Sequence, residues 1–264
     1  MQNTALLGAV SDLARRAGVE ILGVYAQEFE ISHKADQSPL TLADMRAHHV
    51  IAQGLKELTP EIPVLSEEDS DIPYDVRRQW SRYWLVDPLD GTKEFVSRNG
   101  EFTVNIALID NHAPVLGVVH VPVKDTTYAG EAGRGATRRI GSEAAVDIHV
   151  RVPAPATLRV VGSRSHGADL SQHLPHLGPH TLLSIGSSLK FCLVAEGSAD
   201  FYPRFGPTSE WDTAAAQAVL EAAGGAVVKI DATPLRYNQK AVLLNPNFFA
   251  LGDVQRVAAI IKSA

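Results

Sequence analysis

The feature that most constrains the fold is a change in hydrophobic periodicity along the chain. Residues 6–24 and 41–58 repeat apolar side chains at three- and four-residue steps with charges on the opposite face, which is typical of amphipathic helices. From residue 64 the texture changes to short apolar runs bounded by turn residues. These runs predict strands at 64–65, 83–86, 103–109 and 115–121.

The second half of the chain alternates between the two patterns. It predicts strands at 158–161, 199–202, 226–230 and 241–244, and helices at 187–196, 212–223 and 254–262. Such alternation favours an α/β protein with layered helices and sheets. Residues 123–155 are weakly patterned and predict exposed hairpins at a lobe junction. We therefore expect one compact two-lobed unit, with an N-terminal α+β lobe (1–155) and a C-terminal α/β lobe (156–264).

Charge and composition narrow the partners. The chain has 264 residues and a net charge of −6, which argues against binding to duplex nucleic acid or anionic membranes. An anionic substrate must then meet local positive charge or bound cations. The single cysteine, Cys192, excludes an intramolecular disulfide and fits a reducing compartment. Because neither a signal peptide nor an apolar run long enough to span a membrane is found, we expect a cytoplasmic protein.

Three acidic segments stand at the ends of apolar runs or at a helix start. They are 66–69, 87–92 and 211–213. Hard divalent cations such as Mg²⁺ take oxygen ligands, and a two-metal site needs carboxylates from separate elements around ions ~3.5–4 Å apart. The carboxylates that could supply such a site are Glu67, Asp87, Asp90 and Asp212.

The segment 87–92, Asp-Pro-Leu-Asp-Gly-Thr, has a chemical logic of its own. Pro88 fixes a turn, so two carboxylates three positions apart can bracket a metal pair, and the Leu89 carbonyl becomes a further oxygen ligand. Gly91 allows close backbone approach, and the N–H groups of Gly91 and Thr92 can hold a phosphate oxygen.

Each acidic segment also has an ordinary structural interpretation. Asp-Pro-x-Asp-Gly is common in surface turns, and Ser-Glu-Glu-Asp is common in solvated charge runs. Asp212 could be the N-cap of its helix. The pattern alone leaves both interpretations open.

Longer runs resemble a known family. Residues 63–68, 84–95 and 211–215 resemble the signatures of the inositol monophosphatase superfamily. Residues 99–108, 162–166 and 186–197 are similar, within it, to the CysQ-type 3′(2′),5′-bisphosphate nucleotidases. The resemblance runs from about residue 5 to the C-terminus, with no departure at the metal positions.

The resemblance implies an α-β-α-β-α sandwich of the sugar-phosphatase type with the active site between the lobes. It implies two or three Mg²⁺ ions as cofactor, and Glu68 supports the third, weaker one. The implied reaction converts adenosine 3′,5′-bisphosphate to AMP and phosphate, with 3′-phosphoadenylyl sulfate as a related substrate, in sulfate assimilation. Many members are inhibited by Li⁺. The implied metal ligands are Glu67, Asp87, the Leu89 carbonyl, Asp90 and Asp212.

The resemblance also assigns roles to further residues. Asp44, Thr92 and Glu67 are the catalytic candidates, with Asp44 and Thr92 orienting the attacking water. The Thr41–Asp44 spacing is also that of a helix capping box, which is the structural alternative for Asp44. The implied substrate contacts are Glu67, Leu89, Asp90, Gly91, Thr92, Arg164, His166, Ser187, Lys190 and Asp212.

The nucleotide contacts have their own rationale and alternatives. The amides of residues 186–188 at a helix start could bind an anion or a ribose hydroxyl, and Arg164, His166 and Lys190 could meet the second phosphate or the ribose. His166 could equally be an ordinary loop residue and Lys190 a solvated side chain.

Two other functions stay open at this point. One is inositol monophosphatase or sugar bisphosphatase activity on the same metal core, and the other is a non-enzymatic metal- or nucleotide-binding regulator. The partner we expect is a small nucleotide. A monomer or a homodimer, and peripheral association with the cytoplasmic face of the inner membrane, are both compatible with the resemblance.

Overall fold

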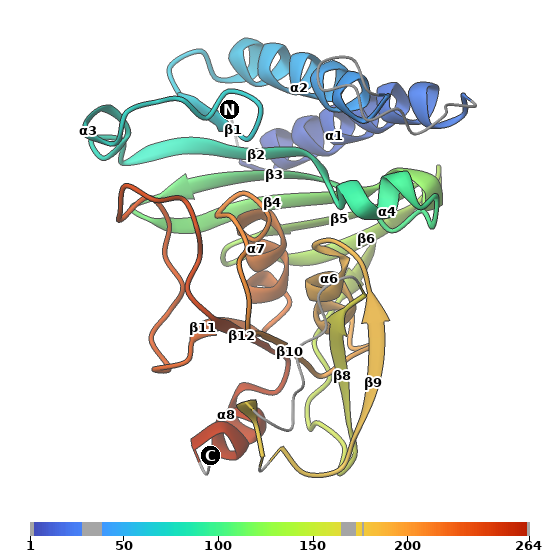
Figure 1. Cartoon of the computed structure of the whole chain (residues 1–264), viewed down its shortest axis with the longest axis vertical. Helices are drawn as coiled ribbons and strands as arrows, with labels where there is room; N and C mark the ends of the chain where they lie inside the picture. The colour runs from blue at the N-terminus through green and yellow to red at the C-terminus, as the bar shows by residue number, and fades with distance from the viewer. Residues whose placement is uncertain (1–2, 28–38, 165–172, 176, 263–264) are drawn as a thin grey trace.

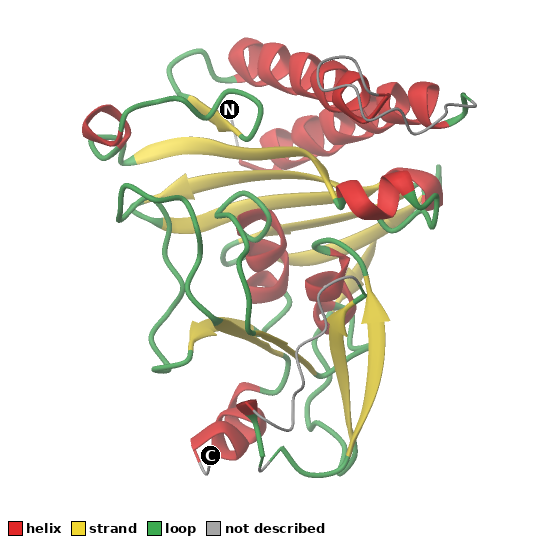
Figure 2. Ribbon diagram, viewed as in Figure 1, coloured by secondary structure: helices red, strands yellow, loops and turns green. Residues whose placement is uncertain are grey.

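The computed structural model describes residues 3–27, 39–164, 173–175 and 177–262, and these form five layers (Figure 1). From one end to the other they are a helix pair, a sheet, a second helix pair, a second sheet and a last helix, as the secondary-structure colouring makes plain (Figure 2). The predicted α-β-α-β-α sandwich is therefore confirmed.

The outer helix pair covers one face of the first sheet. It comprises α1 (Asn3–Tyr25) and α2 (Pro39–Leu58), which pack against each other and against strands β4 and β2. The apolar stripe predicted for the first helix is buried in this contact, as amphipathic periodicity requires. Its buried members are Leu6, Val10, Leu13, Ala17, Ile21 and Val24.

The first sheet runs in chain order from β1 to β7, parallel between β1 and β2 and antiparallel elsewhere. Its strands are β1 (Val64–Ser66), β2 (Arg82–Asp90), β3 (Thr103–Asp110), β4 (Ala113–Val121), β5 (Thr126–Glu131), β6 (Gly135–Ile140) and β7 (Val146–Ile148). Short helices α3 (Tyr74–Arg77), α4 (Thr92–Val96) and η1 (Pro122–Lys124) connect them. The prediction of exposed hairpins for 123–155 is wrong for β5, which is buried along its whole length.

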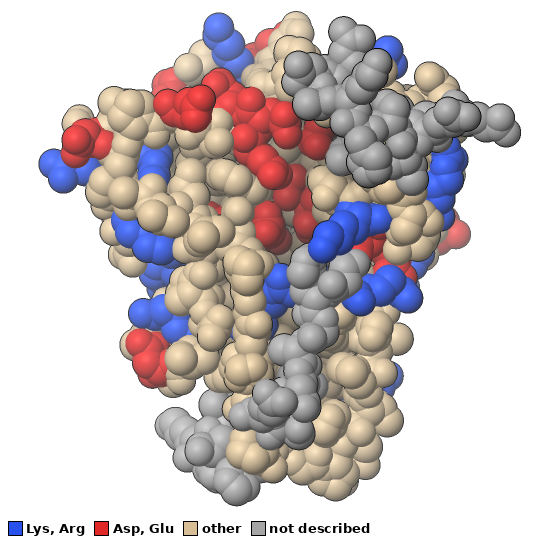
Figure 3. All heavy atoms as spheres, in the orientation of Figure 1, with Lys and Arg blue, Asp and Glu red and all other residues tan. Residues whose placement is uncertain are grey.

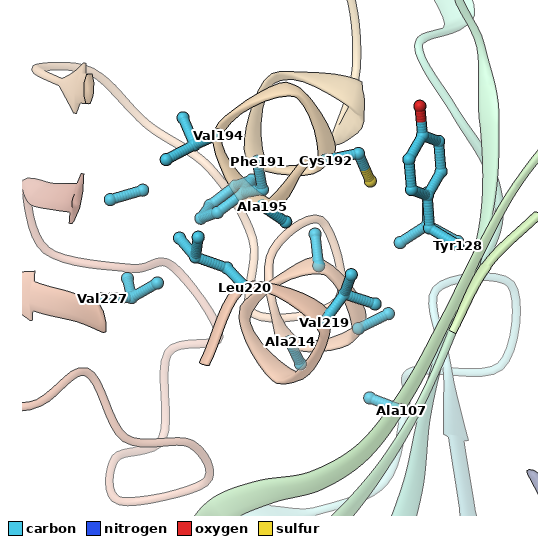
Figure 4. Packing of buried hydrophobic residues seen from close by; sticks show 14 of the residues in the cluster. Ala107, Tyr128, Phe191, Cys192, Val194, Ala195, Ala214, Val219, Leu220 and Val227 are labelled. Atoms are coloured by element: carbon cyan, nitrogen blue, oxygen red, sulfur yellow. The ribbon is translucent and has the colours of Figure 1, made fainter. Parts of the chain in front are cut away.

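The second helix pair lies between the sheets. Figure 4 shows α6 (Leu189–Ala195) and α7 (Ala214–Ala222) placing Phe191, Val219 and Leu220 between Tyr128 of the first sheet and Val227 of the second. Helix α7 lies directly on β4 because Gly117 has no side chain there. A Cβ at Gly117 would stand 2.1 Å from the Ala215 carbonyl oxygen. This close contact fixes the start of α7 against the first sheet.

The second sheet has the order β11-β12-β10-β8-β9, and α8 (Val254–Lys262) covers its outer face (Figure 1). Its strands are β8 (Leu158–Ser163), β9 (His180–Ile185), β10 (Phe201–Arg204), β11 (Ala226–Lys229) and β12 (Phe248–Leu251). The strand predicted at 241–244 is wrong, since only Leu244 forms an isolated bridge, to Ser209. Strands β9 and β12 were not predicted.

Candidate active site

The acidic segment 87–92 forms a β-bulge at the end of β2. Asp87 pairs with Asn105 and Asp90 with Thr103, so β2 carries one residue more than β3 over this stretch. The bulge takes Leu89 out of the regular pairing, and its N–H donates to Asp87 Oδ1 at 3.0 Å. Gly91 then adopts φ +97° and the short helix α4 begins at Thr92. The surface-turn interpretation is wrong, because Asp87 and Leu89 are buried.

Asp212 arrives from the turn before α7. Its Oδ2 accepts the Ser209 N–H at 2.8 Å, and the N-cap of α7 is Thr213, so the N-cap interpretation of Asp212 is wrong. Carboxylate oxygens of Asp87, Asp90 and Asp212 lie within 4.8 Å of one another. We call these three residues the carboxylate wall. The structure thus joins two segments more than a hundred residues apart in the chain.

Two further carboxylates border this wall. Glu67 follows β1, and its N–H donates to the Val86 carbonyl at 3.1 Å. Burial, with the charges of Asp90 and Glu68, raises the pKa of Glu67 to about 7, against a hydrogen bond with Asp87 that lowers it. Asp44 comes from α2 and is 8% exposed. Burial, then the charges of Glu68 and Glu67, raise its pKa to about 8.

The carboxylates have a common electrostatic problem. Burial, followed by the charge of Asp90, raises the pKa of Asp212 to about 8, and burial with Glu67 and Asp90 raises that of Asp87. Buried like charges cannot all ionise without counter-charge. Figure 3 shows acidic side chains gathered in a hollow below the outer helix pair.

The donor set fits a hard divalent cation. It consists of oxygens only, several lie close together, and Oδ1 of Asp44 is buried with no hydrogen-bond partner among the described residues. Such oxygen sets hold Mg²⁺-like ions through carboxylates and water. Glu67 directly follows β1, and Leu89 lies near the end of the neighbouring strand β2. The Glu67 carboxylate and the Leu89 carbonyl could therefore complete the donor set.

Asp90 and Asp212 of the carboxylate wall line a cavity of about 200 Å³. Lys190 of α6 lines the same cavity and is 5% exposed. Its Nζ donates to the carbonyls of Ile185 and Ser187 and lies 5.4 Å from the Tyr202 ring centre. Burial lowers its pKa to about 8, and the charge of Asp90 opposes that shift. Lys190 is thus a buried cation facing the site, not the solvated side chain of the alternative interpretation.

The second buried cation is Arg204 at the end of β10, which the sequence analysis missed. It is 9% exposed and lines the same cavity. Its Nη2 donates to the Pro207 carbonyl at 2.9 Å, while its buried Nε has no partner in the part of the chain that the structure describes. We call Lys190 and Arg204 the cationic wall. The sequence did contain a signal for Arg204, because this charged residue ends a buried strand, as Asp90 ends β2.

The loop from 186 to 188 differs from expectation in detail. The Gly186 N–H donates to Glu101 Oε2 at 2.8 Å and the Ser188 N–H to Asp90 Oδ2 at 2.5 Å. Two of the three amides expected to bind an anion are therefore occupied by carboxylates. Ser187 lines the cavity with φ +50°.

The remaining predicted residues are placed as follows. Gly91 and Thr92 line the cavity beside Asp90. Arg164 forms a two-point ion pair with Glu101, at 2.9 Å from Nε and 2.7 Å from Nη2. This contact holds it on Glu101 and was not predicted. His166 lies outside the described residues.

Comparisons with known proteins agree with this picture. The model of the inositol monophosphatase family matches residues 2–260. A 3′(2′),5′-bisphosphate nucleotidase CysQ from Escherichia coli O157:H7 is 54% identical over 92% of this chain and 98% of its own length. A namesake from Haemophilus influenzae is 36% identical over 95% and 94%.

Solved structures give the same result. The crystal structure of CysQ from Bacteroides thetaiotaomicron, a bacterial member of the inositol monophosphatase family, superposes with a TM-score of 0.84 at 45% identity, covering 94% of this chain and 97% of that one. An inositol monophosphatase from Zymomonas mobilis shares the fold, with a TM-score of 0.81 at 24% identity over 100% and 98%.

Proposed function

The chain belongs to the inositol monophosphatase family, and from this premise we propose that it is a Mg²⁺-dependent nucleotidase. It removes the 3′-phosphate of adenosine 3′,5′-bisphosphate to give AMP and phosphate, and acts on 3′-phosphoadenylyl sulfate as a related substrate. Relatives named for this activity are 36–54% identical to it over nearly their whole length.

The observation that carries the proposal is one cavity lined both by carboxylates, Asp90 and Asp212, and by buried cations, Lys190 and Arg204. The carboxylate wall can bind cations and, through them, the phosphate to be cleaved. The cationic wall offers Lys190 and Arg204 to a second anionic group. A substrate with two phosphates offers one anionic group to the carboxylate-held cations and a second to Lys190 and Arg204, whereas inositol monophosphate has no second phosphate for these two residues. A charge-assisted hydrogen bond to that second phosphate favours the bisphosphate.

The proposed roles follow from position. Glu67, Asp87, Asp90, Asp212 and the Leu89 carbonyl hold two or three Mg²⁺ ions, and Glu68 supports the weakest. When bound, the ions lower the pKa of water and offset the charge of the phosphoryl oxygens. Asp44 and Thr92 would orient the attacking water. Asp44 Oδ1, which has no hydrogen-bond partner among the described residues, could accept a hydrogen bond from it. Because Asp90 Oδ2 already accepts the Ser188 N–H, the other carboxylate oxygen would be the one available to hold a cation.

The proposed substrate contacts fall into two groups, one for the phosphate that is cleaved and one for the rest of the nucleotide. Gly91 and Thr92 offer backbone N–H groups to the cleaved phosphate. Ser187, Lys190 and Arg204 surround the second phosphate, and Arg164 and His166 belong to the proposed nucleotide contacts. Within the described ranges no helix is long and apolar enough to cross a membrane. A cytoplasmic location, with or without peripheral membrane association, and a monomer or homodimer complete the proposal; cell fractionation and light scattering test them.

Phosphate release across a substrate panel tests the proposal. The panel contains adenosine 3′,5′-bisphosphate, 3′-phosphoadenylyl sulfate, inositol 1-phosphate and fructose 1,6-bisphosphate, each with Mg²⁺ or with EDTA. We expect the largest kcat/KM for the bisphosphonucleotide and no turnover in EDTA. Preference for inositol 1-phosphate would instead support the alternative activity on the same metal core. No release from any monoester would contradict a phosphatase.

A further inference from the structure

We propose that Arg77 is a positioning residue for Asp212, acting through a buried latch of Arg77, Asn238 and Glu210 between the first sheet and the turn that carries Asp212. The inference rests on the proposed metal-dependent function. It concerns a residue about 135 positions away from Asp212 in the chain and not in the cavity.

Arg77 ends α3, in the connection that leads into β2 and so to Asp87. It is 2% exposed, an unusual position for a charged side chain. Its Nη1 donates to Asn238 Oδ1 at 2.5 Å, and its Nη2 donates to the carbonyls of Lys240 and Ala241. Asn238 returns a bond from Nδ2 to the Arg77 carbonyl at 2.6 Å. The guanidinium therefore binds one loop through three acceptor oxygens.

That loop joins β11 to β12 and rises to the edge of the first sheet (Figure 1). It is held in turn to Glu210, whose side chain is buried. The Asn238 N–H donates to Glu210 Oε2 at 2.7 Å, and Lys240 Nζ lies 3.1 Å from Oε1. Burial raises the pKa of Glu210, and the hydrogen bonds from Asn238 and Lys240 oppose only part of that rise. Both carboxylate oxygens of Glu210 are thus held by this loop, Oε2 by Asn238 and Oε1 by Lys240.

Glu210 and Asp212 lie in the same turn, but Glu210 belongs to the latch and Asp212 to the carboxylate wall. The Glu210 N–H donates to the Leu243 carbonyl at 2.8 Å, and its own carbonyl accepts the Thr213 hydroxyl at 3.1 Å. The Glu210 backbone is therefore fixed on both sides. Since Asp212 is only two residues on, the latch sets where its carboxylate stands relative to Asp87 and Asp90.

The geometry explains why an arginine is needed. Three acceptors on one loop match the forked donors of a guanidinium, which a lysine ammonium cannot reproduce. Outer partners that orient metal ligands commonly change metal affinity ~10–100-fold when lost. Arg77→Met should therefore weaken Mg²⁺ binding by about tenfold, the lower end of that range because the latch acts through one intermediate.

The test measures Mg²⁺ dissociation constants of the full-length protein by calorimetry, without substrate. Arg77→Met, Arg77→Lys and Asn238→Ala are compared with the wild type, and circular dichroism verifies folding. Arg151→Met is the matched control: Arg151 forms a two-point ion pair with buried Asp200, at 2.6 Å, away from the cavity. It should lower the melting temperature without changing Mg²⁺ affinity.

We expect a weaker Mg²⁺ affinity in Arg77→Met and Asn238→Ala, with Arg77→Lys between them and the wild type. Unchanged affinity in any of the folded latch variants would overturn the proposal. Equal losses in Arg151→Met would do the same, because general destabilisation would then explain them. If the wild type itself bound no Mg²⁺, the proposed function would fail first, which separates the two ideas.

Discussion

The carboxylate wall and the cationic wall of the cavity differ in how their charges are balanced. In the first, burial and neighbouring acids raise the pKa values, to about 8 for Asp212. In the second, Lys190 donates to two backbone carbonyls and Arg204 to one, so each cation is partly satisfied by nearby backbone. The carboxylates can therefore ionise together only when cations are bound, whereas Lys190 and Arg204 keep hydrogen-bond acceptors in the absence of substrate.

The largest expected effect comes from removing a charge from the carboxylate wall. Asp87→Asn or Asp212→Asn should lower kcat by at least about a thousandfold, beyond the ~10–100-fold cost of losing an outer partner. Folding should survive, because each change also removes a buried like charge. Steady-state kinetics and melting curves in EDTA check both halves. Near-wild-type turnover in either variant would refute the ligand assignment.

A smaller and more selective effect is expected at the cationic wall. Arg204→Met should raise KM for adenosine 3′,5′-bisphosphate ~10–100-fold, since a charge-assisted hydrogen bond contributes ~1.5–3 kcal/mol. It should change the kinetics of 3′-AMP, which lacks the second phosphate, by less than about twofold on the same reasoning. Equal losses on both substrates would place Arg204 outside the second phosphate site.

The raised pKa values in and beside the carboxylate wall should also make the stability of the protein depend on pH. The folded-state pKa values of Asp212 and Asp44, about 8, and of Glu67, about 7, lie above their ordinary values, so the folded protein holds these protons more tightly. Their contribution to stability is present at low pH and is lost as pH rises through about 7 to 8.

The melting temperature without metal should therefore fall between pH 5 and pH 8, by at least about 3 °C, the shift that ~1 kcal/mol produces in a chain of this size. Saturating Mg²⁺ should flatten the curve, because bound cations stabilise the ionised carboxylates. The same slope with and without Mg²⁺ would contradict cation binding at this wall. Asp212→Asn is the control and should reduce the slope in EDTA.

The smallest effect expected is inhibition by Li⁺, which the family resemblance implies. Li⁺ should occupy a cation position in the carboxylate wall and slow turnover at low millimolar concentration. Arg204→Met should keep the wild-type sensitivity, since the cationic wall does not bind Li⁺. Sensitivity that changes with Arg204 would break the separation of the walls.

The carboxylate wall was predictable because its residues lie in contiguous motifs, Asp87 and Asp90 at a strand end and Asp212 just before a helix. Asp87 and Asp90 follow an apolar run directly, and the bulge between them comes from one Pro-containing segment. The layered fold followed from periodicity, because long amphipathic helices bury a single face. Strand β9 escaped prediction since most of it is exposed and carries no alternating pattern.

The loops around the site were harder to predict because their conformation depends on distant contacts. Glu101 takes the Gly186 amide from 85 residues away, which no local pattern could indicate. Residues 241–244 looked like a strand because they are apolar, but Arg77 binds the Ala241 carbonyl and holds the segment as a loop. Arg204 needed the rule already applied to the carboxylates, that a charged residue ending a buried strand lines a site.

The most direct test of the central claim is an anomalous diffraction experiment on crystals soaked with Mn²⁺, which prefers the same oxygen ligands as Mg²⁺. We expect anomalous peaks between the carboxylates of Asp87, Asp90 and Asp212, with Glu67 at the edge of the cluster. Peaks only elsewhere on the surface, or none in the cavity at saturating Mn²⁺, would contradict it.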